Sequence, residues 1–265
     1  MFYEQMNSQK SNGTGAVTLV TGASRGIGAA TAELLASRGH RVAINYLQNR
    51  QSAETVLNRI EAAGGVGMVV QGDVSVERDV IDMFDQTEQQ LGAVNGLVNN
   101  VGVLETQMAF ADMTVDRFER VLDINVKGCF ICAQQAIRRM STKRGHENGG
   151  NGGAIVNVSS RASCLGSANE YVDYAASKGA MDTLTIGLAK EVAEEGIRVN
   201  AVRPGFIYTE IHASGGEPGR VDRLAPQIPM QRGGKAIEVA TAIAWLLSEE
   251  ASYTSGTFID IAGGR

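Results

Sequence analysis

From residue 16 onward, short apolar runs alternate with longer stretches of helical periodicity, and few folds accommodate such an alternation. The runs expected to form strands are residues 16–20, 42–44, 67–70, 96–98, 154–158, 198–202 and 258–261. The stretches expected to form helices include residues 28–37, 53–62, 77–90, 117–124, 127–140, 174–194 and 236–247. Because the runs are apolar throughout, the strands should be parallel and buried on both faces. Right-handed crossovers then predict an α/β fold, a doubly wound parallel sheet of the Rossmann type with about seven strands and helices on both faces.

The length and charge of the chain limit its organisation and its partners. With 265 residues and 43% hydrophobic content, the chain can bury the core of one large domain, which we expect at residues 16–265 after a flexible polar tail at residues 1–15. The net charge of −5 argues against a nucleic-acid partner, which would require a basic face. No run reaches the roughly 18 apolar residues of a membrane span, and the first fifteen residues lack a secretory signal, so we expect a cytoplasmic protein without a membrane partner.

The cysteines and histidines give little sign of metal or disulfide chemistry. Three cysteines are an odd number in a chain too large to need disulfides, which indicates a reducing compartment. Cys129 and Cys132 have redox-type spacing, but they lie in the apolar run 126–137, so core packing is favoured over thiol chemistry. The three histidines are scattered in sequence, and we expect no metal site.

A glycine-rich turn lies between the first apolar run and the first helical stretch. It reads Thr21-Gly22-Ala23-Ser24-Arg25-Gly26-Ile27-Gly28. In this position Gly22 lets the chain turn sharply, Gly26 lets the backbone approach a pyrophosphate, and Gly28 lets the helix pack closely on the strand. The N–H groups at the start of the helix would face the anion. The turn therefore predicts a dinucleotide site that includes Ser24, Arg25 and Ile27, and the alternative is a purely structural turn.

Tyr174 and Lys178 are four residues apart on an expected helix, so both side chains lie on one face. A nearby ammonium favours the phenolate, and we therefore expect Lys178 to lower the tyrosine pKa enough for acid/base chemistry. The alternative is a half-buried ring beside a solvated charge. A serine pair, Ser159 and Ser160, ends the apolar run that precedes this helix.

Taken together, the separated motifs resemble the short-chain dehydrogenase/reductase family. Besides the glycine turn, Ser160 and the Tyr174/Lys178 pair, the resemblance rests on Asn99-Asn100-Val101-Gly102, Asn125 and Pro204-Gly205-Phe206-Ile207-Tyr208-Thr209. It extends from about residue 16 to residue 264. The chain is similar to the single-domain members of the family, in particular 3-ketoacyl-carrier-protein reductase and glucose dehydrogenase.

The resemblance implies a role for each polar residue of the catalytic group. Tyr174 would donate a proton in carbonyl reduction and accept one in alcohol oxidation, and Lys178 would hold the nicotinamide ribose hydroxyls. Ser160 would stabilise charge on the carbonyl oxygen, and Asn125 would anchor a water that relays protons, unless it only interrupts the helix. Ser160 lies fourteen residues before Tyr174 instead of the thirteen of many relatives, so one residue must loop out between them.

The resemblance also implies contacts to the cofactor. Asn99 would lie against the adenosine or brace the neighbouring strand, and Asp73 would accept from the adenine amino group or serve as a turn carboxylate. Ile207 and Thr209 would meet the carboxamide, and residues 211–227 would form a mobile lid over the substrate. The remaining residues expected at the cofactor are Val74, Val101, Gly102, Pro204 and Gly205.

The loop after the second strand predicts which dinucleotide is bound. A carboxylate about twenty residues beyond the glycine turn would bind the ribose of NAD, but the chain has Asn45-Tyr46-Leu47-Gln48 there. We therefore expect NADP as the cofactor, with Asn45 and Tyr46 beside it, and keep NAD as the alternative. Arg25 is expected at the 2′-phosphate, helped by Arg50.

These expectations define an enzyme that transfers a hydride between NADP(H) and a small carbonyl or secondary-alcohol substrate. The alternatives are a glucose-type sugar dehydrogenase and a non-catalytic dinucleotide-sensing protein. The resemblance further implies a homotetramer assembled through the long helices at residues 127–140 and 174–194 and the chain end near residues 258–264. A cluster of basic residues, which is either a docking site for a carrier protein or a favourable helix C-terminus, comprises Arg138, Arg139, Lys143 and Arg144.

Overall fold

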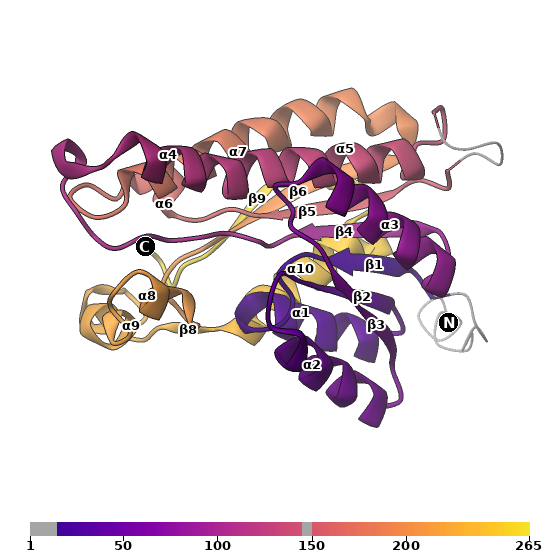
Figure 1. Cartoon of the computed structure of the whole chain (residues 1–265), viewed down its shortest axis with the longest axis horizontal. Coiled ribbons are helices and arrows are strands. Elements are labelled where there is room, and N and C mark those ends of the chain that lie inside the picture. The colour runs from indigo at the N-terminus through magenta and orange to yellow at the C-terminus, as the bar shows by residue number, and fades with distance from the viewer. Residues whose placement is uncertain (1–14, 145–149) are drawn as a thin grey trace, which may run out of the picture.

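A seven-stranded sheet, in which every pair of neighbouring strands is parallel, forms the centre of the molecule (Figure 1). The computed structural model describes residues 15–144 and 150–265, so the tail expected at residues 1–15 lies outside it except for Gly15. The strand order is β3-β2-β1-β4-β5-β6-β9. The bounds are β1 Val17–Val20, β2 Arg41–Tyr46, β3 Val66–Gln71, β4 Val94–Asn99, β5 Gly153–Val158, β6 Ile197–Pro204 and β9 Phe258–Ile261. The predicted fold class is confirmed.

Helices cover both faces of the sheet (Figure 1). One layer contains α1 (Gly26–Ser37), α2 (Arg50–Ala62) and α10 (Ala236–Leu247); the other contains α3 (Glu77–Leu91), α4 (Val115–Leu122), α5 (Gly128–Met140) and α7 (Val172–Glu191). Each layer has its own apolar core. Leu19 and Val20, which are adjacent on β1, are fully buried in different cores, because successive side chains of a strand point to opposite faces.

The helices form where apolar or small side chains recur at helical spacing. The buried residues of α1 include Ala29, Ala32 and Ala36, which lie on one face and leave room for α10 to pack closely against it. The start of α2 is fixed by Asn49, whose side chain accepts a hydrogen bond of 2.9 Å from the backbone N–H of Ser52. The small-residue face of α1 and the Asn49 cap of α2 both depend on residues close together in sequence. The sequence pattern therefore locates these helices well.

Two features of the helical layers differ from the expectation. The helices expected at residues 117–124 and 127–140 are joined by a π-helical turn at Asp123–Lys127, so α4 and α5 continue into each other. Short elements that had no sequence signal gather around the carboxyl ends of the strands. These elements are α6 Ala162–Leu165, β7 Ile207–Tyr208, α8 Ile211–Ser214, α9 Arg220–Leu224 and β8 Gly234–Lys235.

The strand order reverses between β1 and β4, because the chain runs outward from β1 to β3 and then returns to place β4 on the other side of β1. The connections that follow these two strands therefore diverge. In doubly wound sheets ligands bind in the crevice that opens outside the carboxyl ends of the strands at such a point. The fold thus locates a binding site before any side chain is considered.

Candidate active site

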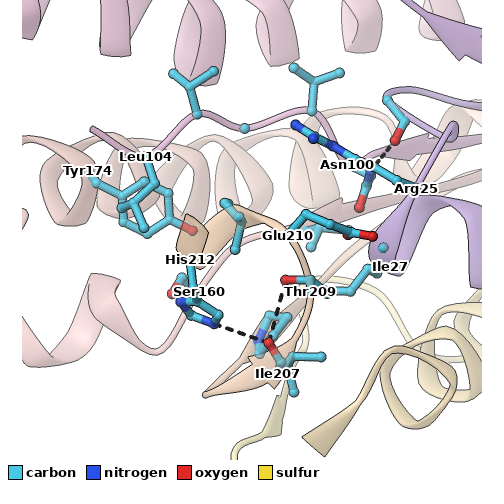
Figure 2. A pocket seen from close by; sticks show the side chains of 18 of the residues that line it. Arg25, Ile27, Asn100, Leu104, Ser160, Tyr174, Ile207, Thr209, Glu210 and His212 are labelled. Carbon is cyan, nitrogen blue, oxygen red and sulfur yellow. Dashed lines mark hydrogen bonds between the residues drawn. The ribbon is translucent and has the colours of Figure 1, made fainter. Parts of the chain in front are cut away.

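A cleft of about 1280 Å³ opens at the carboxyl ends of the strands. It extends from the glycine turn and the loop after β2 to the segments around α6, α8 and α9. Figure 2 shows Arg25 and Ile27 toward one end of the cleft and Tyr174, Ser160 and His212 toward the other. Its size is sufficient for a dinucleotide together with a small molecule.

The glycine turn has the backbone geometry that its sequence predicts. Gly22 and Gly26 adopt φ angles of +60° and +57°, which are unfavourable for any residue with a side chain. Gly28 lies inside the turn, where a Cβ would be only 2.6 Å from the Gly22 carbonyl oxygen. At Gly26 a Cβ would point toward Thr209, 3.4 Å from its methyl carbon, and would fill part of the cleft. The turn therefore has the open backbone that a pyrophosphate needs.

Two asparagine side chains hold this turn in place. Asn45 is buried at the end of β2, and its Oδ1 accepts a 3.0 Å hydrogen bond from the Gly22 N–H. Asn100 donates from Nδ2 to the carbonyl oxygens of Thr21 and Gly22, at 2.9 and 3.2 Å. Both residues line the cleft, but Asn45 Oδ1 and Asn100 Nδ2 are directed to the turn. Asn100 was missed in the sequence, although it lies within the quoted Asn99-Asn100-Val101-Gly102 motif.

Asn99 needs a correction, because it does not line the cleft. Its Nδ2 donates to Asn157 Oδ1 at 3.0 Å and to the Cys129 carbonyl oxygen at 3.4 Å. Asn99 thus braces the neighbouring strand β5, the second of the two roles considered for it. Adjacent residues at a strand end face opposite sides, and Asn100 therefore takes the place in the cleft.

Beside β2 and β3 the cleft lining contains Tyr46, Asp73 and Val74, three of the residues expected at the cofactor. Asp73 Oδ1 accepts hydrogen bonds from Ser75, at 2.9 Å from its N–H and 2.7 Å from its hydroxyl. The Asp73 carboxylate therefore stabilises the turn at residues 73–75, and Asp73 also lines the cleft. Gln48 and Asn49 supply the remaining surface after β2, where the loop offers no carboxylate.

The cations near the glycine turn and the loop after β2 differ in their partners. Arg25 is exposed, lines the cleft and has no carboxylate partner within the described part of the chain. Arg59 also lines the cleft, but it is paired with Glu33 at 2.6 Å. Arg50 pairs with Glu54 and is not part of the lining, which removes the support for its expected contribution.

Lys178 is buried at the other end of the cleft, on the same side of α7 as Tyr174. Its Nζ donates to the Val158 carbonyl oxygen at 2.8 Å and lies 5.6 Å from the centre of the Tyr174 ring. Gly102 leaves space for this ammonium, since a Cβ there would be 3.2 Å from Nζ. Burial lowers the pKa of Lys178 to about 8, so that the ammonium can lose its proton near neutral pH.

The pKa of Tyr174 differs from the sequence-based expectation. Desolvation around its hydroxyl raises this pKa to about 12, and the Ser160 hydroxyl acts in the opposite direction. Lys178, whose ammonium is bonded to the Val158 carbonyl, is not among the causes of the shift. The expectation that the lysine lowers the tyrosine pKa is therefore wrong for the chain as it folds, because desolvation is the largest influence on this pKa.

The two serines at the end of β5 have different surroundings. Ser160 lines the cleft, and its Oγ accepts a 3.1 Å hydrogen bond from the Ala162 N–H. Ser159 is buried and donates to the Lys178 carbonyl oxygen at 3.3 Å, which ties β5 to α7. Between Ser160 and Tyr174 the chain makes a turn with positive φ at Gly166 (+77°), Ser167 (+47°) and Asn169 (+61°). This turn lies in the interval where one extra residue was expected to loop out.

Asn125 lies in the π-helical turn and is completely buried, outside the cleft lining. Its Oδ1 accepts from the Val103 N–H at 2.8 Å, and its Nδ2 donates to the Val103 carbonyl oxygen and to Ser177 Oγ at 3.2 and 3.0 Å. All of these partners belong to the segment after β4 or to α7. Asn125 therefore connects the two, whichever further role it has.

The segment after β6 completes the cleft with Pro204, Gly205, Ile207 and Thr209 in the lining. The Ile207 carbonyl oxygen accepts hydrogen bonds from Thr209 Oγ1 at 3.5 Å and from His212 Nε2 at 3.1 Å (Figure 2). Since a carbonyl only accepts, Nε2 must carry the imidazole proton. Burial lowers the pKa of His212 and favours this neutral form.

The segment expected to form a lid, residues 211–227, includes α8 and α9 and contributes His212 and Arg220 to the cleft. Arg220 is buried and donates to Glu170 at 2.5 Å and to Glu217 at 3.0 Å. Its guanidinium lies 5.2 Å from the centre of the Tyr171 ring. In this arrangement the lid is held against the segment that precedes α7.

The remaining sequence expectations concern cysteines, metals and membranes. Cys129 and Cys132 are buried, and burial raises the pKa of both thiols, that of Cys129 to about 12, which fits core packing. Within residues 15–144 and 150–265, no three side chains of His, Cys, Asp or Glu come together as a metal site would require. Among the helices that the structure describes, none combines the length and apolar character needed to cross a bilayer.

Comparisons with known proteins agree with the geometry of the cleft. The family model described as enoyl-(acyl carrier protein) reductase matches residues 22–265. An uncharacterized oxidoreductase of Escherichia coli K12, YgfF, is 60% identical over 250 residues, which cover 94% of this chain and all of the relative. A 3-oxoacyl-acyl-carrier-protein reductase, FabG of Staphylococcus epidermidis, is 35% identical over 93% of this chain and 97% of its own length.

Solved structures with the same architecture include two that contain a nicotinamide cofactor. A short-chain dehydrogenase from Burkholderia cenocepacia in complex with NADP has a TM-score of 0.85 and 32% identity, and the match covers 96% of this chain and 99% of that one. A blue fluorescent protein from a metagenomic library in complex with NADPH has a TM-score of 0.84 and 30% identity, with the same coverage.

Proposed function

Because this chain belongs to the short-chain dehydrogenase/reductase family, we propose that it transfers a hydride between NADP(H) and a carbonyl or secondary-alcohol substrate, with Tyr174 as the general acid/base. One observation carries the proposal. A single cleft has the open glycine turn at one end, with an Arg25 that has no carboxylate partner in the described part of the chain, and the Tyr174, Ser160 and Lys178 side chains at the other.

The residues of the cleft fit a phosphorylated dinucleotide. Gly22 and Gly26 leave the backbone open at the start of α1, whose N–H groups attract an anion. Arg25 is a cation without a carboxylate partner among the described residues, and the loop after β2 lacks the carboxylate that would favour NAD. The proteins of similar structure that bind NADP or NADPH support the same choice.

The chemistry divides between the cofactor and the side chains. When bound, the nicotinamide would supply the hydride chemistry for interconversion of a carbonyl and an alcohol. In reduction the Tyr174 hydroxyl donates its proton to the carbonyl oxygen as negative charge develops there, and the Ser160 hydroxyl donates a hydrogen bond to the same oxygen. Lys178 uses one N–H for Val158 and has two further donors for the ribose hydroxyls of the cofactor.

The raised pKa of Tyr174 fits its proposed role as the general acid in carbonyl reduction. Desolvation favours the protonated phenol, the form that donates a proton. We propose a carbonyl reductase, and a sugar dehydrogenase is the alternative. NADPH oxidation should be screened with ketoacyl thioesters, diketones, quinones and aldoses, and NADP⁺ reduction with sugars; faster turnover of sugars than of every carbonyl would contradict this choice.

A small free molecule is the proposed substrate, not one attached to a carrier protein. Three of the four basic residues that suggested a docking site have acidic partners: Arg139 pairs with Asp85 and Glu88, Lys143 with Glu194, and Arg144 with Glu195. The charges are therefore largely compensated. If a carrier-bound ketoacyl thioester were reduced far more efficiently than the free thioester, this part of the proposal would be wrong.

We also propose that the chain is a homotetramer in the cytoplasm with one domain at residues 16–265. Apolar side chains are exposed on the outer layer of helices, including Phe118 on α4, Phe130 on α5 and Ile186 on α7. Such a surface indicates an interface between subunits. Light scattering tests the assembly, and a monomeric mass would contradict it.

A further inference from the structure

Residues 103–106, which we call the wall segment, lie between β4 and α4 and form part of the cleft surface. Val103 and Leu104 line the cleft. Leu104 is close to the lid, since a Cβ at Gly215 would be 3.0 Å from both Leu104 Cδ2 and the Tyr171 hydroxyl. The position of this segment relative to Tyr174 therefore decides how a substrate between them would be aligned.

One end of the wall segment is fixed by Asn125. The asparagine exchanges two hydrogen bonds with the backbone of Val103 and donates a third to Ser177 Oγ. Ser177 in turn donates to the Tyr174 carbonyl oxygen at 2.7 Å. The start of the wall segment is thus connected to the first turns of α7 through side chains that are completely buried.

The other end of the wall segment is fixed by an ion pair that the proposed reaction does not use. Arg117 of α4 donates from Nη1 to the Thr106 carbonyl oxygen at 2.6 Å. Its Nε and Nη2 donate to Asp173 Oδ2 and Oδ1, at 2.6 and 3.1 Å, in a bidentate pair. Asp173 Oδ1 also accepts from the Tyr174 N–H at 2.9 Å. The two side chains are only 8% and 2% exposed.

We propose that Arg117 and Asp173 are a positioning pair. The pair fixes the position of the wall segment relative to Tyr174, so that a bound carbonyl meets the phenol hydroxyl. The inference rests on the proposed function. Neither residue lines the cleft, so both act through others. Because Asn125 holds Val103 and Arg117 holds Thr106, the wall segment and the start of α7 behave as one rigid unit.

Stability alone does not account for this pair. Apolar residues of similar volume often replace a buried ion pair without loss of stability, so such a pair is weak evidence for a stabilising role. The planar guanidinium, however, fixes the relative position of the two groups it binds. A displacement of about 1 Å at a reacting centre can reduce a rate about a hundredfold.

The test removes both charges and keeps the hydrogen bond to the tyrosine backbone. In Arg117→Met with Asp173→Asn, no charge is left unpaired, and the asparagine oxygen still accepts from the Tyr174 N–H. We expect a melting temperature within a few degrees of the parent and a dissociation constant for NADPH within about twofold. The value of kcat/KM for the carbonyl reduced fastest in the screen should fall tenfold or more, mostly through kcat.

Two further variants separate a positioning role from the general effect of removing a buried arginine. Arg139→Met removes another buried arginine, which joins α5 to α3 away from the cleft, and it should keep the parent kcat/KM even if the melting temperature falls. Arg117→Lys keeps the charge but not the bidentate geometry, and it should give an intermediate kcat. Parent-like kinetics in the double variant would overturn the proposal, as would a loss no larger than that of Arg139→Met.

Hydrogen exchange tests the pair independently of turnover. Peptides that cover residues 103–108 should exchange at least several-fold faster in the double variant than in the parent or in Arg139→Met, and equal exchange would overturn the proposal. If the parent reduces no carbonyl of the screen, the proposed function fails. The exchange result would then still decide whether Arg117 and Asp173 fix the wall segment.

Discussion

The two ends of the cleft are built in different ways. The end proposed for the cofactor is lined chiefly by two short stretches of chain, the glycine turn at residues 21–28 and the loop after β2, together with Asp73 and Val74 after β3. The substrate end consists of side chains from the wall segment, from the turn before α7 and from the lid. The first depends on where a strand ends, whereas the second depends on how distant segments pack.

The two ends of the cleft therefore tolerate different substitutions. At the cofactor end Gly28 has no room for a Cβ, and the buried Asn45 is bonded to the turn, so most substitutions there disturb the backbone. At the substrate end Arg220 is held by two carboxylates of separate segments. Side chains there can change without altering the sheet, which suits the part of a family fold that determines substrate choice.

The largest effect is expected from removing the Tyr174 hydroxyl. Tyr174→Phe should lower kcat for carbonyl reduction by about 10²–10⁴-fold, because the hydroxyl proposed to supply the proton is removed. The dissociation constant for NADPH, measured by fluorescence titration, should stay within a few-fold of the parent. A rate within a few-fold of the parent would exclude Tyr174 as the acid and would favour a dinucleotide-sensing protein.

A substitution in the glycine turn should have the reverse effect, a loss of NADPH binding. In Gly28→Val the new side chain would meet the Gly22 carbonyl oxygen, 2.6 Å from the position of Cβ, and the turn would have to shift. Overpacking of this kind costs about 1–3 kcal/mol of stability, and we expect NADPH binding to weaken by up to about a hundredfold. Calorimetric titration measures the binding. Gly179→Val, on an open face of α7, is the control, since nothing lies within 4 Å of its Cβ position; equal binding in both variants would refute the role of Gly28.

Arg25 should distinguish the two nicotinamide cofactors. Hydrogen bonds to charged groups contribute about 1.5–3 kcal/mol, so Arg25→Ala should lower kcat/KM for NADPH by roughly ten- to a hundredfold and leave that for NADH nearly unchanged. Arg50→Ala is a matched control, because Arg50 is paired with Glu54 outside the cleft. An equal loss with both cofactors would mean that Arg25 does not read the 2′-phosphate, and a parent that prefers NADH would contradict the choice of NADP.

The pH dependence of reduction should follow the substrate end. Lys178 has a pKa lowered to about 8, so its ammonium is present below that pH and is lost as the pH rises through it. If the charge is needed, kcat for reduction should fall about tenfold between pH 7 and pH 9. Lys178→Arg keeps a positive charge over this range and should flatten the profile, whatever its absolute rate. A parent profile that is level to pH 9 would contradict the requirement for the charge.

The same contrast explains what could be predicted from the sequence. The glycine turn, the seven strands and the Tyr174/Lys178 helix are local patterns, and the structure has all of them in place. Asn99 and Asn100 could not be told apart, because the sequence does not say which of two adjacent residues faces the cleft at a strand end. The tyrosine pKa could not be predicted either, since it depends on burial by segments far apart in the chain.

Residues that act through buried ion pairs could not be identified from the sequence pattern. Arg117 lies in an amphipathic helix like any surface arginine, and only the fold brings it to Asp173, which is 56 residues away in sequence. The same holds for Arg220 and Glu170. Such pairs determine the geometry of the substrate end, and for this reason the substrate class is harder to derive than the cofactor.

The smallest expected effect lies where the two ends meet. Glu210 precedes α8 of the lid, lines the cleft and is exposed, and its Oε2 is 3.5 Å from the position that a Cβ at Gly26 would take (Figure 2). A carboxylate there stands near the start of α1, where the pyrophosphate of the cofactor would bind. The two negative charges repel, so Glu210→Gln should bind NADPH about two- to fivefold more tightly, and the gain should shrink at high salt. Glu250→Gln, an exposed acid remote from the cleft, should leave the dissociation constant unchanged. Weaker binding in Glu210→Gln would instead mean that the carboxylate helps to hold the cofactor, and the lid would then belong to the cofactor end as much as to the substrate end.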